Sequence, residues 1–383
     1  MFNFLPTQYK NTLQKKINHN YLHEQFSDYE DIFKKIASTV LKGDYTLGDP
    51  VNIFEKNFSK LINSKYSIGV GSGTDALFLS LKALNIGDNK NDEVITTPFT
   101  FYATIGAIVT AGAKPVFVDV GEDYNIDTKK IEKSITKNTK AILPVHWTGR
   151  ICDMKNIKLL CKKYNLKLIE DSCHALLAKQ NNKFAGTFGD TGCFSLHPLK
   201  NLNVWGDGGI VCTQSKTLAK KIYLLRNHGL SRRDKCKVFA FNSRLDTIQA
   251  IVGNHLLKKI KFITRKRIEN SVALDKLLKS CQQAELPKRK INKMNREVFH
   301  LYSINFKNRN KLKKFLESKG IDARIHYPIP MHLQPAAKYL NYQAGDFPVA
   351  EMISKSTLSL PVHEFISKND LECMVNHIYD FYK

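Results

Sequence analysis

The sequence contains no long hydrophobic run. Its longest uncharged apolar stretch covers residues 101–113, which is shorter and more polar than the roughly 20 apolar residues of a membrane-spanning helix. The first ten residues also lack the continuous apolar core of a secretion signal. We therefore expect no membrane partner, no export signal and a cytoplasmic location.

Cysteine pairs with metal-binding or redox spacing are also missing. The eight cysteines stand singly, with no Cys-x-x-Cys pair and no Cys/His cluster at zinc spacing. A chain of this length can be stabilised by a hydrophobic core, so we expect reduced, buried thiols and no disulfide framework. We also predict no metal site.

Acidic residues are scarce relative to basic ones. The chain has 35 Asp and Glu against 59 Lys and Arg, which gives a formal net charge of +24. Such a charge is compatible with nucleic-acid binding, but the lysines are spread along the whole chain, and no nucleic-acid-binding motif appears. We expect no nucleic-acid partner; binding to duplex DNA at moderate salt would test that alternative. The positive potential would instead help to gather an anionic, phosphorylated substrate.

What is present is the composition of an ordinary globular protein, 43% hydrophobic and 25% charged over 383 residues. This length is sufficient for two domains. Short apolar runs alternate with segments of helical periodicity, which predicts an α/β fold with a mainly parallel sheet. Strands are expected at 66–70, 93–96, 115–118, 141–145, 167–170, 192–195 and 209–212, and helices at 29–41, 76–84, 102–111, 128–134 and 154–164.

The pattern changes after Leu245. A long helical region at 246–279 is expected to lead out of the large domain. A strand, a helix and a strand at 298–306, 309–319 and 321–325 then predict a small α+β C-terminal domain. Residues 1–27 are expected to form an irregular lead-in. We place a large domain, with this lead-in, at residues 1–255 and the small domain at residues 256–383.

Lys200 is the residue whose sequence neighbours indicate a catalytic role. It follows a predicted strand and precedes the glycine-rich segment 206–209, and Asp171 stands upstream at the end of another apolar strand. A lysine that can form a Schiff base and a carboxylate that can keep a pyridine nitrogen protonated are what pyridoxal phosphate requires. A lone lysine in so basic a chain is ordinarily a solvated surface group, so the hypothesis depends on its neighbours.

Those neighbours form an ordered set. Gly73 and Thr74 lie between a predicted strand and helix, where small residues and free amides suit a phosphate. Phe101 is the aromatic residue that we expect to stack on a ring. His174 is expected near the phenolic oxygen of that ring, and Ser195 is expected to donate its hydroxyl to the phosphate. Each residue alone is equally well explained by a turn, a cap or core packing.

In this order and spacing, the set resembles the DegT/DnrJ-type sugar aminotransferases, which are fold-type I, aspartate-aminotransferase-like pyridoxal phosphate enzymes. The resemblance extends from about Gly43 to the C-terminus. It implies a three-layer large domain with a mainly parallel sheet and a small α+β C-terminal domain. The segments that carry it are Gly-Asp-Tyr-Thr-Leu-Gly (43–48), Gly-Ser-Gly-Thr-Asp-Ala-Leu (71–77), Pro-Phe-Thr-Phe (98–101), Glu-Asp-Ser-Cys-His (170–174), His-Pro-Leu-Lys-Asn-Leu (197–202), Arg-Asn-His-Gly (226–229), Asn-Ser-Arg-Leu-Asp-Thr-Ile-Gln-Ala (242–250) and Gly-Asp-Phe-Pro-Val-Ala-Glu (345–351).

The resemblance also implies roles for individual residues. Lys200 and Asp171 would be catalytic, with pyridoxal 5'-phosphate as cofactor and pyridoxamine phosphate as its aminated form. Asn242 would reach the phosphate in the neighbouring subunit, which implies a homodimer with shared active sites. Arg244 would hold a carboxylate of the amino donor. The nucleotide-sugar or the donor would lie near His326 and Tyr327. Gly73, Thr74, Phe101, His174 and Ser195 would complete the cofactor site.

The activity that the resemblance implies is transfer of an amino group from L-glutamate to a keto-sugar. We expect a nucleotide-linked 6-deoxyhexose, and the segments 242–247 and 326–330 favour the 3-keto over the 4-keto branch. The product would enter surface polysaccharide, glycan or antibiotic sugar biosynthesis. Trp147 and Trp205 depart from the family pattern, and either they reshape the sugar pocket or they simply pack.

Two further alternatives stay open within the same fold. One is a sugar dehydratase, a branch in which histidine replaces the catalytic lysine; Lys200 argues against it. The other is a non-catalytic regulator that retains the pyridoxal phosphate fold to sense a metabolite. The presence of both Lys200 and Asp171 disfavours the regulator.

Overall fold

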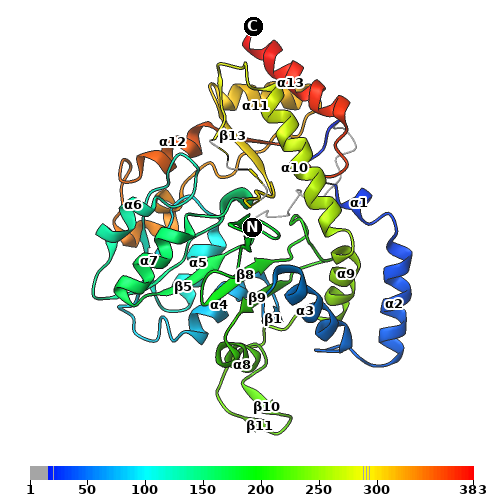
Figure 1. Ribbon diagram of the computed structural model, residues 1–383, viewed down its shortest axis with the longest axis vertical. Helices are drawn as coiled ribbons and strands as arrows, with labels where there is room; N and C mark the ends of the chain where they lie inside the picture. The colour runs from blue at the N-terminus through cyan, green and yellow to red at the C-terminus, as the bar shows by residue number, and fades with distance from the viewer. Residues whose placement is uncertain (1–15, 20, 288, 290, 293) are drawn as a thin grey trace, which may run out of the picture.

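A computed structural model describes residues 16–19, 21–287, 289, 291–292 and 294–383. Its centre is a seven-stranded sheet with the strand order β1-β9-β8-β5-β4-β2-β3 (Figure 1). Strand β9 runs antiparallel to both of its neighbours, and the other four pairings are parallel. The predicted mainly parallel α/β sheet is therefore confirmed. The strands are β1 (Tyr66–Val70), β2 (Glu93–Thr96), β3 (Lys114–Phe117), β4 (Thr139–Ile142), β5 (Lys167–Asp171), β8 (Thr191–Ser195) and β9 (Gly209–Thr213).

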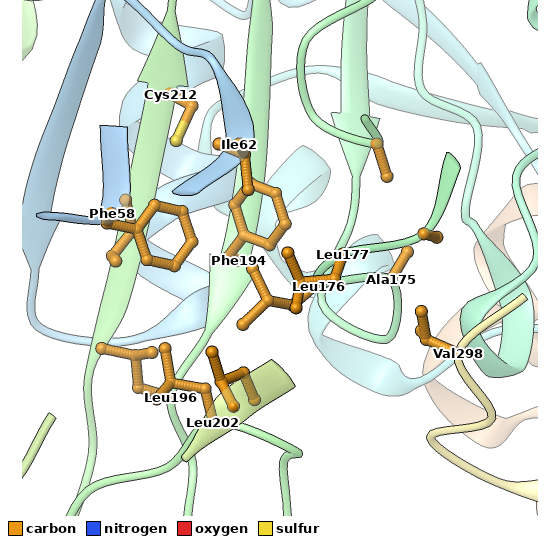
Figure 2. Packing of buried hydrophobic residues seen from close by; sticks show 14 of the residues in the cluster. Phe58, Ile62, Ala175, Leu176, Leu177, Phe194, Leu196, Leu202, Cys212 and Val298 are labelled. Carbon is orange, nitrogen blue, oxygen red and sulfur yellow. The ribbon is translucent and has the colours of Figure 1, made fainter. Parts of the chain in front are cut away.

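Helices cover both faces of this sheet and make three layers. Because side chains alternate along a strand, Phe194 enters one hydrophobic cluster and the adjacent Cys193 enters the other. One face is covered by α4 (Gly73–Ala83), α5 (Tyr102–Thr110) and α8 (Lys216–Leu225). The other is covered by α3 (Asp49–Ile62), α7 (Met154–Tyr164) and α9 (Thr247–Leu257). Figure 2 shows part of the cluster on the face covered by α3, α7 and α9. In this cluster the rings of Phe58 and Phe194 pack edge to face, with a centroid distance of 5.2 Å.

A smaller α+β unit follows in the C-terminal part of the chain. Its antiparallel sheet consists of β12 (Ala284–Glu285), β13 (Tyr302–Phe306) and β14 (Thr357–Leu360). Helices α11 (Arg309–Ser318) and α13 (Lys368–Tyr382) pack on it, at the top of Figure 1. This confirms the predicted small α+β unit. The remaining helices and short strands are α1 (Leu22–Gln25), α2 (Tyr29–Leu41), α6 (Thr128–Ile131), α12 (Pro348–Ser356), β6 (Lys179–Gln180), β7 (Lys183–Phe184), β10 (Leu230–Arg232) and β11 (Lys235–Cys236).

Helix α10 (Ile260–Leu277) connects the two units (Figure 1). Its first turns contribute Ile260 and Ile263 to a cluster beside the large sheet, and Leu274 enters the core of the small unit. The domain boundary that we place between residues 255 and 256 stays a prediction. Across the described residues, no helix is both long enough and apolar enough to cross a membrane.

Several predicted elements differ from the structure in physically informative ways. The expected helix at 246–279 is two helices, α9 and α10, separated at Lys258 and Lys259. The strand expected at 298–306 begins only at Tyr302, because Phe299 adopts a positive φ of 50°. The strand expected at 321–325 is reduced to two isolated bridges, one to Ile17 and one to Ser359. Helices α1, α3, α8, α12 and α13 are additional to those predicted.

The N-terminal segment reaches the C-terminal unit. Of the lead-in expected at residues 1–27, residues 1–15 and 20 lie outside the described residues. Ile17 pairs in parallel with Ile321 and is buried in the core of the small unit. The backbone N–H of His19 donates to Asp322 at 3.3 Å. The part of the lead-in that the structure describes is therefore integrated with residues more than three hundred positions away. It is also not wholly irregular as expected, because α1 lies within it.

Strand register brings the predicted site segments to one edge of the large sheet. Strands β1, β8 and β5 share one direction, so their C-terminal ends, Val70, Ser195 and Asp171, meet at that edge. Gly209 of β9 lies between the first two, paired with both Val70 and Ser195. A Cβ atom at Gly209 would stand 2.1 Å from the carbonyl oxygen of Ser72. Glycine at this position therefore allows the segment after β1 to pack against the segment after β8.

Candidate active site

A cavity of about 340 Å³ opens at this edge, between the large sheet and the small unit. Its size lies within the usual range for small-molecule sites. Nine of the eleven predicted site residues line it, and Asn242 and Arg244 do not. The nine are Gly73, Thr74, Phe101, Asp171, His174, Ser195, Lys200, His326 and Tyr327.

The N-terminus of α4 forms an anion cradle on the cavity wall. Ser72 caps this helix, its Oγ accepting from the backbone N–H of Asp75 at 3.0 Å. The N–H groups of a first helical turn have no intrahelical partners, and their dipoles favour an anion. A Cβ at Gly73 would lie 2.6 Å from the Cβ of Ser195. Only glycine lets the helix start approach the Ser195 hydroxyl so closely, and this arrangement fits a phosphate group.

Asp171 is a buried carboxylate with a fixed orientation. Its Oδ2 accepts from the Thr104 hydroxyl at 2.8 Å, and its Oδ1 accepts from the backbone N–H of Cys173 at 3.2 Å. Thr104 is in turn 2.7 Å from the hydroxyl of Thr100. A carboxylate held in this way, on the wall of the cavity, is suited to keeping a proton on a basic ring nitrogen that approaches it.

The residue before Asp171 anchors the end of β5 from behind. Glu170 is fully buried and accepts from the backbone N–H groups of Gly186, Phe188 and Gly189 at 2.6 to 2.8 Å. Its Oε2 is also 3.0 Å from His146 Nε2. A buried carboxylate with this many partners is well satisfied. The two adjacent acidic residues therefore have different roles: Glu170 fixes the end of β5, and Asp171 faces the cavity.

Lys200 lies in the irregular loop between β8 and β9. Burial lowers the pKa of its amine below the usual range, against the opposing influence of Cys173 and Asp171. A lower pKa increases the neutral fraction, which is the nucleophilic and basic form of an amine. The environment of Lys200 therefore suits a lysine that attacks a carbonyl carbon and later transfers a proton.

Aromatic and imidazole side chains complete the wall above the carboxylate. Phe101 is 48% exposed, and its ring centroid lies 5.7 Å from that of Tyr327. The ring of His174 lies 4.2 Å from that of His300. Burial, followed by Lys200 and His326, lowers the pKa of His174 well below its usual value. Its buried Nδ1 has no hydrogen-bond partner among the described residues, so a neutral imidazole nitrogen is left for a ligand.

The two tryptophans pack outside the cavity lining. Trp147 is 1% exposed, and its ring contacts those of Phe99, His174 and Tyr327 at centroid distances of 4.7 to 5.4 Å. Trp205 lies instead against Phe26 and Phe33. Both indoles therefore pack against other rings, and Trp147 supports two side chains that line the cavity; an effect of either residue on the sugar pocket stays a prediction.

Asn242 and Arg244 lie beside the segment that follows β1, away from the cavity of their own chain. Asn242 is exposed, and Arg244 Nη1 donates to Asn227 Oδ1 at 3.1 Å. The backbone N–H of Gly71 donates to the carbonyl of Ser243. The contact of Asn242 with a neighbouring subunit stays a prediction, as does the donor contact of Arg244.

The structure adds cavity residues that the sequence did not indicate. Those that lie outside the quoted segments come largely from the N-terminal segment and the small unit, far apart in the sequence. Among them are Arg267 and Arg324, two cationic side chains opposite the large sheet. Only Arg324, two residues before His326, had a nearby signal. The added residues include His19, Tyr21, Arg267, His300, Arg324 and His363.

The cavity residues fit pyridoxal phosphate. The cradle at Gly73 and Ser195 suits its phosphate, Asp171 suits its ring nitrogen, and the free nitrogen of His174 suits a polar ring substituent. When bound, this cofactor supplies an electron-accepting ring that stabilises negative charge beside an amine. Within the described part of the chain, no cluster of His, Cys, Asp and Glu could hold a metal ion.

The pKa of His326 links the folding stability of the protein to pH. Burial, then Arg324 and Lys200, lowers its pKa from 6.5 to about 4. Between these values the unfolded chain binds a proton that the folded chain does not, so stability is lost as the pH falls from 6.5 to 4. At ~1.4 kcal/mol per pKa unit, the loss from this residue is about 3 kcal/mol.

We therefore expect His326→Gln to make the free energy of unfolding less dependent on pH between 6.5 and 4. Urea denaturation of both proteins at several pH values measures this difference. His23→Gln, a change at an exposed histidine, is the control and should follow the wild-type curve. Parallel curves for His326→Gln and the wild type would contradict the assignment.

Comparisons with known proteins agree with this geometry. Residues 27–379 match the DegT/DnrJ/EryC1/StrS aminotransferase family. A pleiotropic regulatory protein of Geobacillus stearothermophilus is 36% identical over 364 residues, which cover 94% of this chain and 97% of the relative. A dTDP-3-amino-3,6-dideoxy-alpha-D-galactopyranose transaminase of Aneurinibacillus thermoaerophilus is 38% identical over 352 residues, covering 91% and 95%. The crystal structure of NtdA from Bacillus subtilis with bound cofactor PMP has a TM-score of 0.88 and 29% identity, covering 97% of this chain and 86% of NtdA.

Proposed function

Because the chain belongs to the DegT/DnrJ/EryC1/StrS aminotransferase family, we propose that it transfers the amino group of L-glutamate to a nucleotide-linked keto-sugar. The protein is a pyridoxal phosphate-dependent aminotransferase. The observation that carries the proposal is the single cavity that joins Lys200, Asp171 and the cradle at Gly73 and Ser195.

Each predicted residue of the cofactor site would have a defined task in this reaction. Asp171 would keep the ring nitrogen of the cofactor protonated, and Gly73, Thr74 and Ser195 would hold its phosphate. Phe101 would pack against the ring, and His174 would hydrogen-bond beside it. Lys200 Nζ would remove the proton from Cα of glutamate; the amino nitrogen would stay with the cofactor, and water would supply the keto oxygen of the departing 2-oxoglutarate. In the second half-reaction the same amine would return a proton to the sugar carbon that receives the nitrogen, and the keto oxygen of the sugar would leave as water.

The acceptor is a 3-keto, nucleotide-linked 6-deoxyhexose. The relative from A. thermoaerophilus supports this choice, since its name specifies a 3-amino-3,6-dideoxy sugar. The segments 242–247 and 326–330 favour the same branch. The product would enter the synthesis of surface polysaccharide, a glycan or an antibiotic sugar.

A panel of 3-keto and 4-keto nucleotide sugars, incubated with glutamate and read by mass spectrometry, tests this function. We expect amino-sugar and 2-oxoglutarate in equal amounts with a 3-keto substrate. Deoxygenation of the sugar without net amine transfer would instead identify a dehydratase. The cofactor is added in excess, so that absence of turnover cannot result from its loss.

A second candidate function is a metabolite-sensing regulator. It is favoured by the name of the relative from G. stearothermophilus, which matches nearly the whole chain. A regulator has no need for a lysine with a lowered pKa facing a buried carboxylate, and this chain retains both. Failure of every keto-sugar in the panel, despite bound cofactor, would favour the regulator.

Arg324 is the cavity arginine best placed to hold a carboxylate of the donor. Its Nε and Nη2 donate to Asp322 at 3.2 and 2.7 Å, which fixes the guanidinium on the cavity wall. Arg324 and Lys200 line the same cavity. Arg244, to which the resemblance assigns this contact, bonds Asn227 of its own chain, and its donor contact stays a prediction.

We expect Arg324→Gln to raise the KM for glutamate by roughly 10- to 100-fold, because a charge-assisted hydrogen bond contributes about 1.5 to 3 kcal/mol. The KM for the keto-sugar should change little. Steady-state kinetics with each substrate varied in turn measures both constants. Arg265→Gln, at a guanidinium that is 66% exposed on α10, controls for loss of positive charge. An unchanged KM for glutamate would remove Arg324 from the donor site.

The working unit is a homodimer in the cytoplasm. Asn242 is exposed at the edge of its own chain, which leaves its amide available to a second subunit. In that dimer, Asn242 of each chain would hydrogen-bond the phosphate bound by the other.

A further inference from the structure

A chain of polar side chains leads from the Lys200 loop to the N-terminal segment and then to the small unit. Asn203 Nδ2 donates to the backbone carbonyl of Lys200 at 3.0 Å and to Gln25 Oε1 at 2.6 Å. Gln25 Nε2 donates to Glu364 Oε1 at 2.9 Å. Residues from α1, from the loop between β8 and β9, and from the segment after β14 therefore share one hydrogen-bonded series.

The far end of this series faces the catalytic cavity. Glu364 Oε2 lies 3.8 Å from Arg267 Nε. Arg267 lines the cavity, and its Nη1 donates to the backbone carbonyls of Phe299 and His300, each at 3.2 Å. The series thus connects the backbone of Lys200 with a guanidinium on the opposite wall of the same cavity.

The residues of this series are buried, which raises the free-energy cost of breaking their hydrogen bonds. Asn203 is 0%, Gln25 3%, Glu364 6% and Arg267 2% exposed. A buried amide that loses its partner incurs a desolvation cost of about 1 to 3 kcal/mol. None of the three polar contacts can therefore be exchanged readily for water, and the series holds a defined geometry.

The chemistry of the groups also fixes the direction of the series. A carboxylate accepts hydrogen bonds but donates none, so Glu364 requires the NH₂ end of Gln25. The oxygen of Gln25 must then face Asn203, which presents its own NH₂ group. The second hydrogen of that group is directed to the carbonyl of Lys200. The acidic residue in the small unit therefore determines the hydrogen bond that the catalytic loop receives.

We propose that Gln25 and Asn203 are positioning residues for Lys200, and that they couple its backbone to the Arg267 wall of the cavity. The inference rests on the proposed role of Lys200. This lysine must hold the cofactor and later act as a free base, so its side chain moves while its backbone stays fixed. A loop without helix or strand provides little rigidity, and a misplacement of about 1 Å can cost roughly 100-fold in rate.

The first test replaces Gln25 with methionine, which has a similar volume but forms neither hydrogen bond. We expect kcat to fall about 10-fold or more, which corresponds to ~1.4 kcal/mol, while the KM values for glutamate and the keto-sugar change by less than about twofold. Asn203→Ala should have the same effect. The matched control is Gln249→Met, because Gln249 Nε2 donates at 3.0 Å to the carbonyl of Trp205, in the same loop. It should reduce stability without reducing kcat.

The second test needs no sugar and no turnover. Cofactor-free protein is mixed with pyridoxal phosphate, and its capture by Lys200 is followed by absorbance. We expect slower capture in Gln25→Met and Asn203→Ala and a normal rate in Gln249→Met. Wild-type protein that captures the cofactor but aminates no sugar would refute the proposed function and leave this inference standing.

If Gln25→Met does not fold, Asn203→Ala supplies the measurement. It removes the donor to the Lys200 carbonyl without placing a second carboxylate beside Glu364. Folded Asn203→Ala protein with a wild-type capture rate and kcat would overturn the proposal. Equal losses in Gln249→Met and Gln25→Met would do the same, because any loosening of the loop would then suffice.

Discussion

Lys200→Ala is expected to lower kcat by at least about 1,000-fold, since it removes both the nucleophile and the general base of the reaction. The absorbance of the lysine-bound cofactor should disappear as well. Burial lowers the pKa of its amine, which favours the neutral, nucleophilic form. Stopped-flow spectra with glutamate and steady-state turnover measure the two effects.

Lys200→Arg is the matched control for this experiment. It keeps a positive charge in the loop but cannot release a proton at neutral pH, so it should be as inactive as the alanine variant. Lys200→Ala should unfold at a temperature close to that of the wild type, because burial already disfavours the charged amine in the folded state, whereas Lys200→Arg, which stays charged, should unfold at a lower temperature. Transamination by folded Lys200→Ala at the normal rate would show that another residue is the base.

Asp171→Asn is expected to lower kcat by at least about 100-fold. A neutral amide of nearly the same shape would not keep the ring nitrogen of the cofactor protonated. An opposite charge within about 4 to 6 Å changes the pKa of an ionisable group by about 1 to 3. The electron-accepting character of the ring therefore weakens. The rate of the first half-reaction with glutamate, followed by absorbance, measures the loss.

The neighbour of Asp171 provides the comparison. Thr104→Val removes the hydroxyl that donates to Asp171 Oδ2 but leaves the carboxylate charged, so its effect should stay below about 10-fold. The ratio between the two variants separates the charge of Asp171 from its orientation. Equal losses in both would mean that orientation alone matters, and a wild-type rate in Asp171→Asn would exclude the proposed role.

Sequence patterns predicted the large-sheet side of the site because that side is local. The cradle at Gly73, the carboxylate Asp171 and the loop with Lys200 each lie at or soon after the end of a strand, and strands of one direction bring such positions to a common edge. The bounds of β1, β2, α2 and α7 were predicted to the residue. The spacing of apolar residues within these segments is sufficient to predict a helix or a strand.

The opposite wall could not be predicted in the same way. His19, Arg267 and Arg324 reach the cavity through contacts between distant segments, such as the pairing of Ile17 with Ile321. Nothing local in those segments distinguishes a cavity residue from a surface residue. The role of Trp147 was left open for a related reason, since only the packed rings around it determine whether an indole is buried behind a pocket or exposed within it.

The pairing of Ile17 with Ile321 also constrains the order of assembly. The partner of Ile17 is synthesised more than three hundred residues after it. The central sheet can form before then, whereas His19 and its neighbours wait for the segment around Ile321. A complete scaffold can therefore precede a finished cavity, and competence for catalysis follows this pairing.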